Sequence, residues 1–303
     1  MALPRLRRFT FTAALCSAYL FFVPLTFSQQ AATAPQTAAT PPKSNVTAAD
    51  LTREQMEHFL ISARIVAERP AGKGITGTRR VTLTDGQYTH DAHIQDIDVY
   101  QAEYRTKTGI EKNFRDSYKF NIAAYRLDKI MDLNIVPVCV PREVNGKPAA
   151  VDWWVDDVLF DEEGRRDKNA EPPDENEWTR QLNTIRDFDQ LIYNDDRNQG
   201  NLLIDKAWKL WAIDHSRAFR DKHALRDPDV LRRISAKMLA AMRTLTEQQL
   251  VDSLEPYITQ EDIDALLVRR DLLVKFFESE ITSKGEDSIL TDIPRHTQRV
   301  TIP

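Results

Sequence analysis

The chain has 303 residues, of which 42% are hydrophobic and 29% are charged, with 15 prolines and 9 glycines. This composition is close to that of an average globular protein and excludes a disordered or fibrous chain. A net charge of −5 leaves no basic excess for neutralising phosphates, so nucleic acid is not an expected partner. The length fits one large domain or two intimate ones.

The first 28 residues have the three parts of a secretory signal peptide. Three arginines within residues 5–8 precede an uncharged stretch, Phe9–Phe27, and the small Ser28 follows it. We therefore expect a cleaved signal and a secreted or periplasmic protein. The alternative is an uncleaved membrane anchor, because 19 uncharged residues nearly reach the ~20 that span a bilayer. Pro24 and the threonines weaken that span.

Cleavage after residue 28 removes three arginines and no acid, which changes the net charge from −5 to −8. Cys16 leaves with the signal, and Cys139 is then the one cysteine that remains. No internal disulfide can form, so the mature fold must rest on its core. Residues 29–49 are rich in Ala, Thr and Pro and lack an apolar period. They are expected to form a disordered linker.

The next hundred residues are predicted to be rich in β-structure. The spacing Thr52-x-x-Gln55 is typical of a capping box and predicts a short helix through about residue 67. Two alternating runs, 79–83 and 88–97, flank Asp85-Gly86 and predict a β-hairpin. Apolar residues at helical spacing over Phe114–Asp132 predict an amphipathic helix.

A second hairpin and a change of character follow. Short β-rich runs at 135–140 and 149–155 are joined by Asn145-Gly146, which favours a tight turn. Residues 156–176 are polar and strongly acidic and are predicted to form a connection between two parts of an α+β protein.

The second part is predicted to be mostly helical. Residues 177–193 have helical spacing, and two short apolar strands are predicted at 201–204 and 210–213. The chain from about 229 to 283 is then helical. Two helix starts are predicted within it, at Thr246-x-x-Gln249 and at Thr259-x-x-Asp262.

The stretch from residue 191 to 216 carries the side chains of a phosphotransfer site. Asp196 precedes Asn201 by five residues, and Asp214 follows Asn201 by thirteen. One carboxylate can orient or deprotonate a hydroxyl, while an amide oxygen and a second carboxylate hold Mg²⁺ against nucleotide phosphates. Asn201 begins one predicted strand and Asp214 ends its partner, so both side chains are expected at one edge. A plain polar turn over residues 195–198 is the alternative.

This stretch resembles the protein kinase superfamily, most closely its atypical branch of phosphatidylinositol kinases, HipA-type kinases and the actin-fragmin kinase. It also has some likeness to secreted kinases of the Fam-twenty and CotH kinds. The family's catalytic loop Asp-Arg-His-x-x-Asn corresponds to residues 196–201, and its Asp-Phe-Gly corresponds to Asp214-His215-Ser216. The resemblance implies a two-lobed fold that uses ATP and Mg²⁺. It makes Asp196 the catalytic residue, and Asn201 and Asp214 the metal ligands.

Taken together, the patterns and the resemblance divide the chain into six parts. These are a signal peptide over 1–28, a disordered linker over 29–49, a β-rich kinase-like N-lobe with one long helix over 50–155, an acidic lobe connection over 156–176, a larger helical C-lobe over 177–292, and a tail over 293–303.

A glycine-rich segment lies ahead of the first predicted strand. Gly72, Gly74 and Gly77 stand where a kinase has the loop that covers the phosphates, whereas a Rossmann fingerprint would follow a strand and open a helix. An ordinary glycine-rich turn is the alternative. With the resemblance, we assign these glycines and Lys73 to nucleotide binding.

The departures from the family lie at two positions that also belong to the nucleotide site. Gln95 stands where the third strand of a kinase has Lys, and Asn121 stands where the following helix has Glu. An amide pair would replace the ion pair, and the loss of one preorganised donor costs ~10²–10³ in rate. Lys73, Arg79, Arg80 or Lys119 are candidates to supply the charge, although each is otherwise an ordinary solvated cation.

Two histidines, His90 and His93, flank Asp91 on a predicted strand. They point to opposite faces and make a poor metal pair. His215 is expected to be packed rather than reactive.

The leading hypothesis is an exported ATP- and Mg²⁺-dependent phosphotransferase with an unknown hydroxyl-bearing acceptor. The rival is a pseudokinase-like domain that binds a nucleotide or acts as a scaffold without transfer. A metal-dependent hydrolase using the same carboxylates is a third alternative, and it lacks the clustered histidines usual for such sites. Membrane contact is expected only if the signal segment stays attached.

Overall fold

The computed structural model describes residues 51–70, 79–105 and 109–292, and these belong to the unit Pro41–Pro303. The predicted signal peptide, the whole predicted linker, the glycine-rich segment and the tail lie outside the described residues. Within the described ranges, no helix combines the length and the apolar character needed to cross a membrane.

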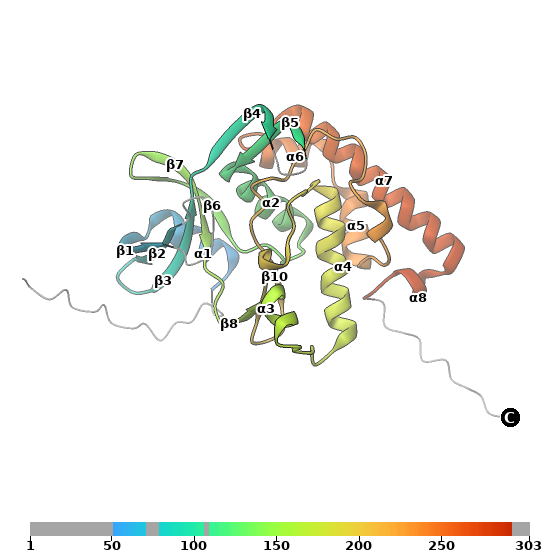
Figure 1. Ribbon diagram of the computed structural model, residues 1–303, viewed down its shortest axis with the longest axis horizontal. Helices are drawn as coiled ribbons and strands as arrows, with labels where there is room; N and C mark the ends of the chain where they lie inside the picture. The colour runs from blue at the N-terminus through green and yellow to red at the C-terminus, as the bar shows by residue number, and fades with distance from the viewer. Residues whose placement is uncertain (1–50, 71–78, 106–108, 293–303) are drawn as a thin grey trace, which may run out of the picture. The chain divides into compact units, whose positions relative to one another are not determined.

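An antiparallel five-stranded sheet forms most of the N-terminal part. Its order is β1-β2-β3-β7-β6, which brings the two predicted hairpins side by side (Figure 1). Gly86 has a φ of +96°, and Asn145 and Gly146 have φ values of 54° and 75°, as tight hairpin turns require. Both predicted turns are therefore confirmed. The strands are β1 (Arg64–Pro70), β2 (Arg79–Thr84), β3 (Thr89–Gln95), β6 (Cys139–Val144) and β7 (Lys147–Trp153).

Two helices belong to this sheet. The first, α1 (Arg53–Ser62), begins with the predicted capping box of Thr52 and Gln55. It ends sooner than predicted because the chain turns into β1. The second, α2 (Tyr118–Met131), is capped by Ser117 and packs against β6 and β7.

The predicted start of the second helix, Phe114, was wrong by four residues. Residues 110–117 form a strand, β5 (Ile110–Ser117), which pairs with β4 (Asp98–Arg105) in a separate two-stranded sheet. Phe114 and Tyr118 are both buried, so their spacing mimicked a helix turn. Arg115 on β5 donates to both carboxylate oxygens of Asp262 at 2.7 and 2.9 Å, which fixes the β4–β5 pair to the helical part.

The connection over 156–176 is more structured than predicted. It contains β8 (Val158–Asp161) and α3 (Glu162–Asp167), and β8 pairs with β9 (Leu202–Asp205). The antiparallel strands β9 and β10 (Leu210–Ala212) were predicted at 201–204 and 210–213, and each of their ends lies within one residue of the prediction.

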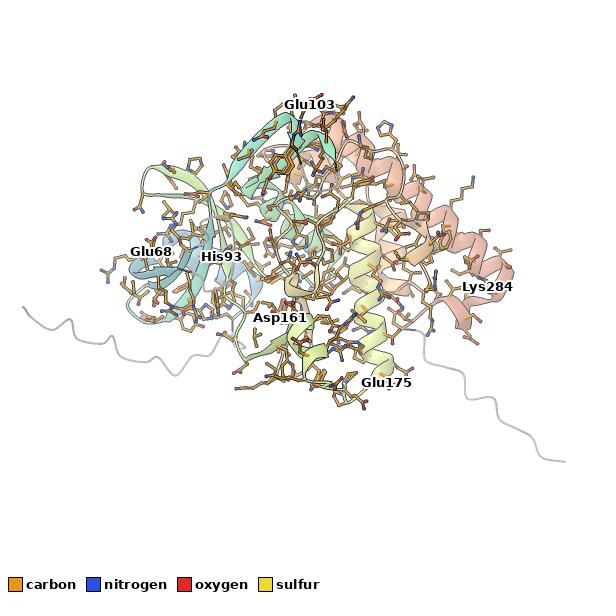
Figure 2. All side chains as sticks on the ribbon, in the orientation of Figure 1. Glu68, His93, Glu103, Asp161, Glu175 and Lys284 are labelled. Carbon is orange, nitrogen blue, oxygen red and sulfur yellow. The ribbon has the colours of Figure 1, made fainter. Side chains whose placement is uncertain are left out.

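The rest of the chain is helical, as predicted. Long helix α4 precedes the β9–β10 pair, and the start of α4 at Glu175 and the end of α7 at Lys284 are labelled in Figure 2. Both predicted capping boxes, at Thr246 and Thr259, are present. The elements are α4 (Glu175–Leu191), a 3₁₀ turn (Gln199–Asn201), a second 3₁₀ turn (Pro228–Val230), α5 (Ala236–Thr244), α6 (Glu247–Leu254), α7 (Gln260–Lys284) and α8 (Glu286–Ile289).

One buried apolar cluster connects the sheet, α2 and the helical part. It includes Leu83 on β2, Ile122 on α2 and Phe188 on α4, each with no more than a trace of exposed surface. Full burial of a side chain of this size stabilises the fold by about 1.5–3 kcal/mol. The segments that carry the site residues therefore rest on a shared core.

Candidate active site

The loop after α4 is shaped by a buried asparagine and a buried acid. Asn194 is fully buried and donates through Nδ2 to Asp189 Oδ1 at 2.9 Å. Its own Oδ1 accepts from the backbone N–H of Asp196 at 3.2 Å. A side chain that bonds to the backbone two residues on is a standard way to set a turn. The position of Asp196 is therefore fixed from within the protein.

Arg197 ties this loop to the segment that carries Asp214. It forms a two-point ion pair with Asp189, at 2.9 and 3.0 Å. It also donates to the backbone oxygens of Asn201 at 3.0 Å and Ile213 at 2.6 Å, and to His215 Nε2 at 2.9 Å. The planar fork of arginine suits such multiple contacts. Arg197 stands in the recognised motif, but its role as the central tie was not predicted.

His215 is packed, as expected. Its side chain is buried, and burial together with the charge of Arg197 holds the pKa of His215 well below its ordinary value. The ring is therefore neutral and accepts from Arg197. It supports the loop from within.

Asn201 and Asp214 lie at the same end of the β9–β10 pair, as predicted. The backbone N–H of Ile213 donates to the backbone oxygen of Asn201 at 3.1 Å, which sets the two segments side by side. Asp214 is exposed and has a left-handed φ of 55°. Non-glycine residues adopt this region rarely, and Asp and Asn most readily. Ser216 Oγ donates to Asp214 Oδ1 at 3.0 Å.

A third carboxylate, Asp116 on β5, joins the two that the sequence indicated. Burial raises the pKa of Asp116, and the charges of Asp214 and Asp196 raise it further. Burial likewise raises the pKa of Asp196, with Asp214 and Asp195 adding to the rise while Arg217 opposes it. The backbone N–H of Ser117 donates to the backbone oxygen of Ser216 at 2.8 Å, and Arg217 Nη1 lies 3.5 Å from Asp196 Oδ1. The strand that carries Asp116 therefore lies beside the segment of Asp214, and that segment reaches Asp196.

The sequence could not have singled out Asp116. It lies in a stretch that was predicted to be helical, and it reaches the other two acids only through the tertiary fold. Asp116 Oδ1 is buried, and it has no hydrogen-bond partner among the described residues.

The predicted amide pair is present. Asn121 on α2 donates through Nδ2 to Gln95 Oε1 at the end of β3, and both side chains are buried. The Oδ1 atom of Asn121 accepts from the backbone N–H of His215 at 2.6 Å. One asparagine thus connects the sheet, α2 and the residue after Asp214, without any charge.

The other cations considered from the sequence have carboxylate partners elsewhere. Arg80 pairs with Asp91 at 2.5 Å and Lys119 pairs with Asp98 at 2.8 Å. Arg79 is 3.3 Å from both Glu68 and Asp96, and Lys73 lies outside the described residues. Arg79, Arg80 and Lys119 therefore each form ion pairs with carboxylates other than the three site acids.

The two histidines on β3 lie on opposite faces, as predicted. His90 is buried and its ring stacks on Trp153 at 3.8 Å between centroids. His93 contacts Asp152 at 3.1 Å instead. The two rings therefore serve different contacts.

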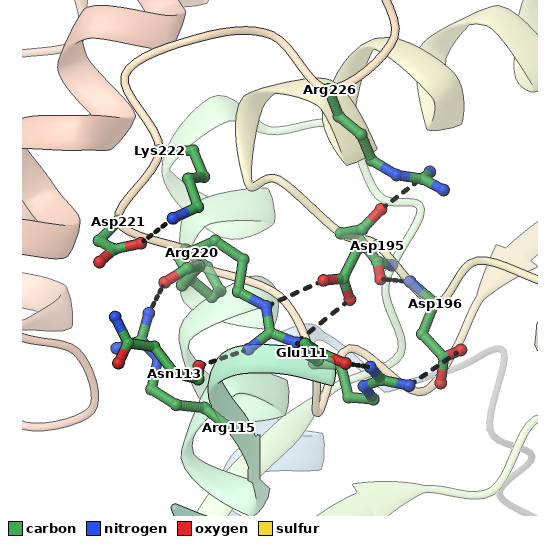
Figure 3. A network of polar contacts seen from close by, with 12 residues as sticks. Glu111, Asn113, Arg115, Asp195, Asp196, Arg220, Asp221, Lys222 and Arg226 are labelled. Atoms are coloured by element: carbon green, nitrogen blue, oxygen red, sulfur yellow. Dashed lines mark hydrogen bonds and ion pairs between the residues drawn. The ribbon is translucent and has the colours of Figure 1, made fainter. Parts of the chain in front are cut away.

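A network of ion pairs lies beside Asp196. Glu111 on β5 accepts from Arg217 at 2.9 Å and from Arg220 at 2.8 Å. Arg220 also donates to Asp195 at 3.0 Å, and Figure 3 shows it between Glu111 and Asp195. Arg217 Nη1 lies 3.5 Å from Asp196 Oδ1. The β4–β5 pair thus reaches the predicted catalytic loop.

Two of the three site acids reach solvent, since Asp214 is exposed and Asp196 is half-exposed. The side chain of Asp196 is 47% exposed. Cavities of about 300 and 270 Å³ lie elsewhere, one lined by residues such as Arg180 and Arg233 and the other by residues such as Arg115 and Tyr257. The segment predicted to cover the phosphates lies outside the described residues.

Among the described residues, no group of three or more His, Cys, Asp or Glu side chains could hold a metal ion by itself, and Asp116, Asp196 and Asp214 are no exception. The predicted ligands are one amide and one carboxylate, and Mg²⁺ commonly takes only one or two carboxylates, with phosphate oxygens and water completing its shell.

No family model matches the sequence, and no curated protein matches it. Solved structures do match. A structure of Fam20 from hydra, with sugar, superposes with a TM-score of 0.62 at 14% identity, covering 84% of this chain and 95% of that chain. The Golgi casein kinase with Mn/ADP bound superposes with a TM-score of 0.57 at 13% identity, covering 79% and 78%. The fold is that of an atypical protein kinase.

The predicted two-part α+β kinase-like fold is therefore confirmed. Identities of 13% and 14% establish the fold and not the chemistry, since one fold hosts many functions. The chemistry must be argued from the site itself.

Proposed function

We propose that this protein is an exported phosphotransferase that moves the γ-phosphoryl group of ATP, with a divalent metal, to a hydroxyl. Asp196 orients the acceptor, Asn201 and Asp214 hold the metal, and the glycines at 72, 74 and 77 with Lys73 cover the phosphates. The observation that carries the proposal is a pair of contacts. The backbone N–H of Ser117, next to Asp116, donates to the backbone oxygen of Ser216 in the Asp214 segment at 2.8 Å, and Arg217 of that segment lies 3.5 Å from Asp196.

The expected role of Asp196 follows from its surroundings. A group that takes a proton from a hydroxyl works best when its pKa approaches the working pH, and burial and the neighbouring acids raise the pKa of Asp196. Phosphoryl transfer asks the protein mainly for positioning and charge stabilisation. The contact of Asn194 Oδ1 with the backbone N–H of Asp196 supplies such positioning.

The donor set fits a hard divalent cation such as Mg²⁺ or Mn²⁺. Asn201 and Asp214 offer the oxygen atoms that such ions prefer. Asp116 adds a buried oxygen with no hydrogen-bond partner among the described residues. A bound cation would screen the phosphate charge during transfer. The matched Golgi casein kinase was solved with Mn/ADP, which supports the same pairing of ions and nucleotide here.

Export and the acceptor class belong to the same proposal. The N-terminal pattern supports a signal peptide, and one of the matched kinases is named for the Golgi. The names of the matched structures mention a sugar and casein, so sugar and protein hydroxyls are the two acceptor classes to try first. We retain residues 50–155 and 177–292 as the proposed N-lobe and C-lobe.

The first test is transfer of labelled phosphate from ATP by the purified protein, with Asp196→Asn as the key variant. We expect transfer to fall by ~10²–10⁴, while ATP still binds because Asn keeps the size of the side chain. Asp221→Asn is the matched control, since Asp221 pairs with Lys222, and its transfer should equal that of the wild type. Equal transfer by wild type and Asp196→Asn would overturn the assignment of Asp196.

A second candidate function is a nucleotide-binding domain without transfer. The neutral pair of Gln95 and Asn121 favours it, because neither side chain can offset phosphate charge. The discriminating measurement adds ATP and Mn²⁺ at about 100 times the dissociation constant, which raises the free energy of unfolding by about 2.7 kcal/mol if they bind. Binding without phosphate transfer to any acceptor would favour this alternative.

A further inference from the structure

A phosphotransferase with the proposed site lacks a cation where the family pattern puts one. Gln95 and Asn121 are neutral and hydrogen-bonded to each other. The charge that develops on the transferred group must be met by some other side chain, because preorganised cations and donors supply much of the rate in such reactions. The question is which described cation reaches the position where the phosphoryl group moves.

Arg217 is a cation beside Asp196, the residue proposed to orient the acceptor. It is three residues beyond Asp214, and its Nη1 atom is 3.5 Å from Asp196 Oδ1. The acceptor hydroxyl must approach Asp196, and the phosphoryl group must approach that hydroxyl. A cation beside Asp196 therefore lies next to the bond that forms.

Not all of the hydrogen-bond donors of Arg217 are used by the contacts described so far. Its Nη2 is engaged by Glu111 at 2.9 Å, but its Nε is buried and makes no hydrogen bond among the described residues. The contact of Nη1 with Asp196 is longer than an ordinary charge-assisted hydrogen bond. Arg220 differs, because three of its nitrogen atoms already donate to Asp195, Asn113 and Glu111 at 2.8–3.2 Å.

The β4–β5 pair holds Arg217 in place. Glu111 of β5 accepts from it, and the guanidinium lies 5.0 Å from the ring centre of Phe114, also on β5. A cation over an aromatic face is attracted to it. These contacts fix the guanidinium before any ligand binds, which lowers the entropy cost of using it.

We propose that Arg217 binds the transferred phosphoryl group and supplies the positive charge that Gln95 does not. This rests on the proposed transfer from ATP. In that step the acceptor oxygen forms a bond to phosphorus while the bond to the bridging oxygen breaks. The leaving electron pair stays on ADP, and the hydroxyl proton passes to Asp196. Arg217 donates to the moving phosphoryl oxygens throughout.

The test compares the affinity of the full chain for ATP and for ADP, in Mn²⁺, by isothermal titration. Arg217→Ala is expected to weaken ATP binding about tenfold or more and leave ADP binding unchanged, because only ATP has the γ-phosphoryl group. Transfer should fall by ~10²–10³. Arg217→Lys keeps the charge without the fork and should lose less; it also serves if the alanine variant does not fold.

Lys222→Ala is the matched control, because it removes an exposed positive charge five residues along the same segment. It should change neither affinity. Equal losses of ATP and ADP binding in the Arg217 variants, or no loss of either, would overturn the role of Arg217 while leaving transfer from ATP standing. Failure of the wild-type protein to bind either nucleotide would overturn both proposals.

Discussion

The two sides of the candidate site hold their residues by different physics. On the side of the loop after α4, Arg197 makes charged contacts with Asp189 and holds the segment leading to Asp214. On the side of β3 and α2, Gln95 and Asn121 make neutral hydrogen bonds, and Asn121 reaches the backbone of His215. Both sides therefore hold the segment from Ile213 to His215, which contains Asp214.

Under the proposed function, the difference would mean that the chain keeps the framework of a kinase site and carries the positive charge at another position. Burying two neutral amides that satisfy each other avoids the desolvation cost of a buried ion pair. Under the proposed function, this arrangement leaves the nucleotide without the cation that the family pattern places there. Two cations come from the segment after Asp214 and are connected by Glu111, namely Arg217 beside Asp196 and Arg220 beside Asp195.

The largest expected effect tests the charged side. Asp214→Asn should weaken metal-dependent nucleotide binding by about 100-fold or more, since even outer contacts of a metal site cost 10–100-fold. Asn tolerates the left-handed backbone at this position and can still accept from Ser216, so the fold should persist. The measurement is titration of a non-hydrolysable ATP analogue in Mn²⁺.

Asp221→Asn is the control for that measurement, because this acid lies seven residues along the same segment and pairs with Lys222. It should leave the affinity unchanged. If Asp214→Asn bound the analogue as tightly as the wild type does, Asp214 would not be a metal ligand and the contrast between a charged and a neutral side would lose its functional meaning.

The next largest effect concerns the stability cost of a buried carboxyl on α2, a cost that the neutral pair of Gln95 and Asn121 avoids. Asp128 on the same helix is a buried carboxyl near Arg53, and burial raises its pKa to about 6. A raised pKa means that the folded state binds the proton more tightly, so the stability falls as the pH rises through this range. Between pH 4.5 and 7 the wild type should lose about 2 kcal/mol relative to Asp128→Asn, measured by urea unfolding.

Asp132→Asn gives the opposite sign when the same urea unfolding is extended down to about pH 3. The hydrogen bond with Lys237 lowers the pKa of Asp132, which is exposed. Its contribution to stability is present at higher pH and is lost as the pH falls through its folded pKa. A pH dependence of the same sign for both variants would contradict the view that burial controls Asp128.

The parts that the sequence predicted well are those set by local physics. The capping box at Thr52 and the turn at Asn145-Gly146 depend on residues a few positions apart. So does the spacing that brings Asn201 and Asp214 to one end of a strand pair. Each of these can be read without knowing what else the chain packs against.

The parts that the sequence missed depend on contacts between distant segments. β4 is polar and largely exposed, so it has no one-sided apolar pattern to reveal it. Asp116 and Glu111 lie on β5, about a hundred residues from the arginines and acids they meet. The apolar spacing of Phe114 suited a helix, and only pairing with β4 decides for a strand.

The smallest expected effect tests the neutral pair directly through a double-mutant cycle. Gln95→Lys alone and Asn121→Glu alone each place a charge in a buried position without an opposite charge, which destabilises the fold. Together the two charges face each other. We expect a favourable coupling of about 1 kcal/mol between the two substitutions, measured from the free energies of unfolding in urea.

In the matched control the lysine is introduced at Thr89, at the other end of β3, and Gln95 is left unchanged. Six residues of strand separate the two positions by about 20 Å, so Thr89→Lys should not couple to Asn121→Glu. Coupling confined to Gln95 would show that this position faces α2 as the third-strand lysine of a kinase does. Equal coupling at both positions would mean that the introduced charges act at long range, and the neutral contact would then not be what joins β3 to the segment of Asp214.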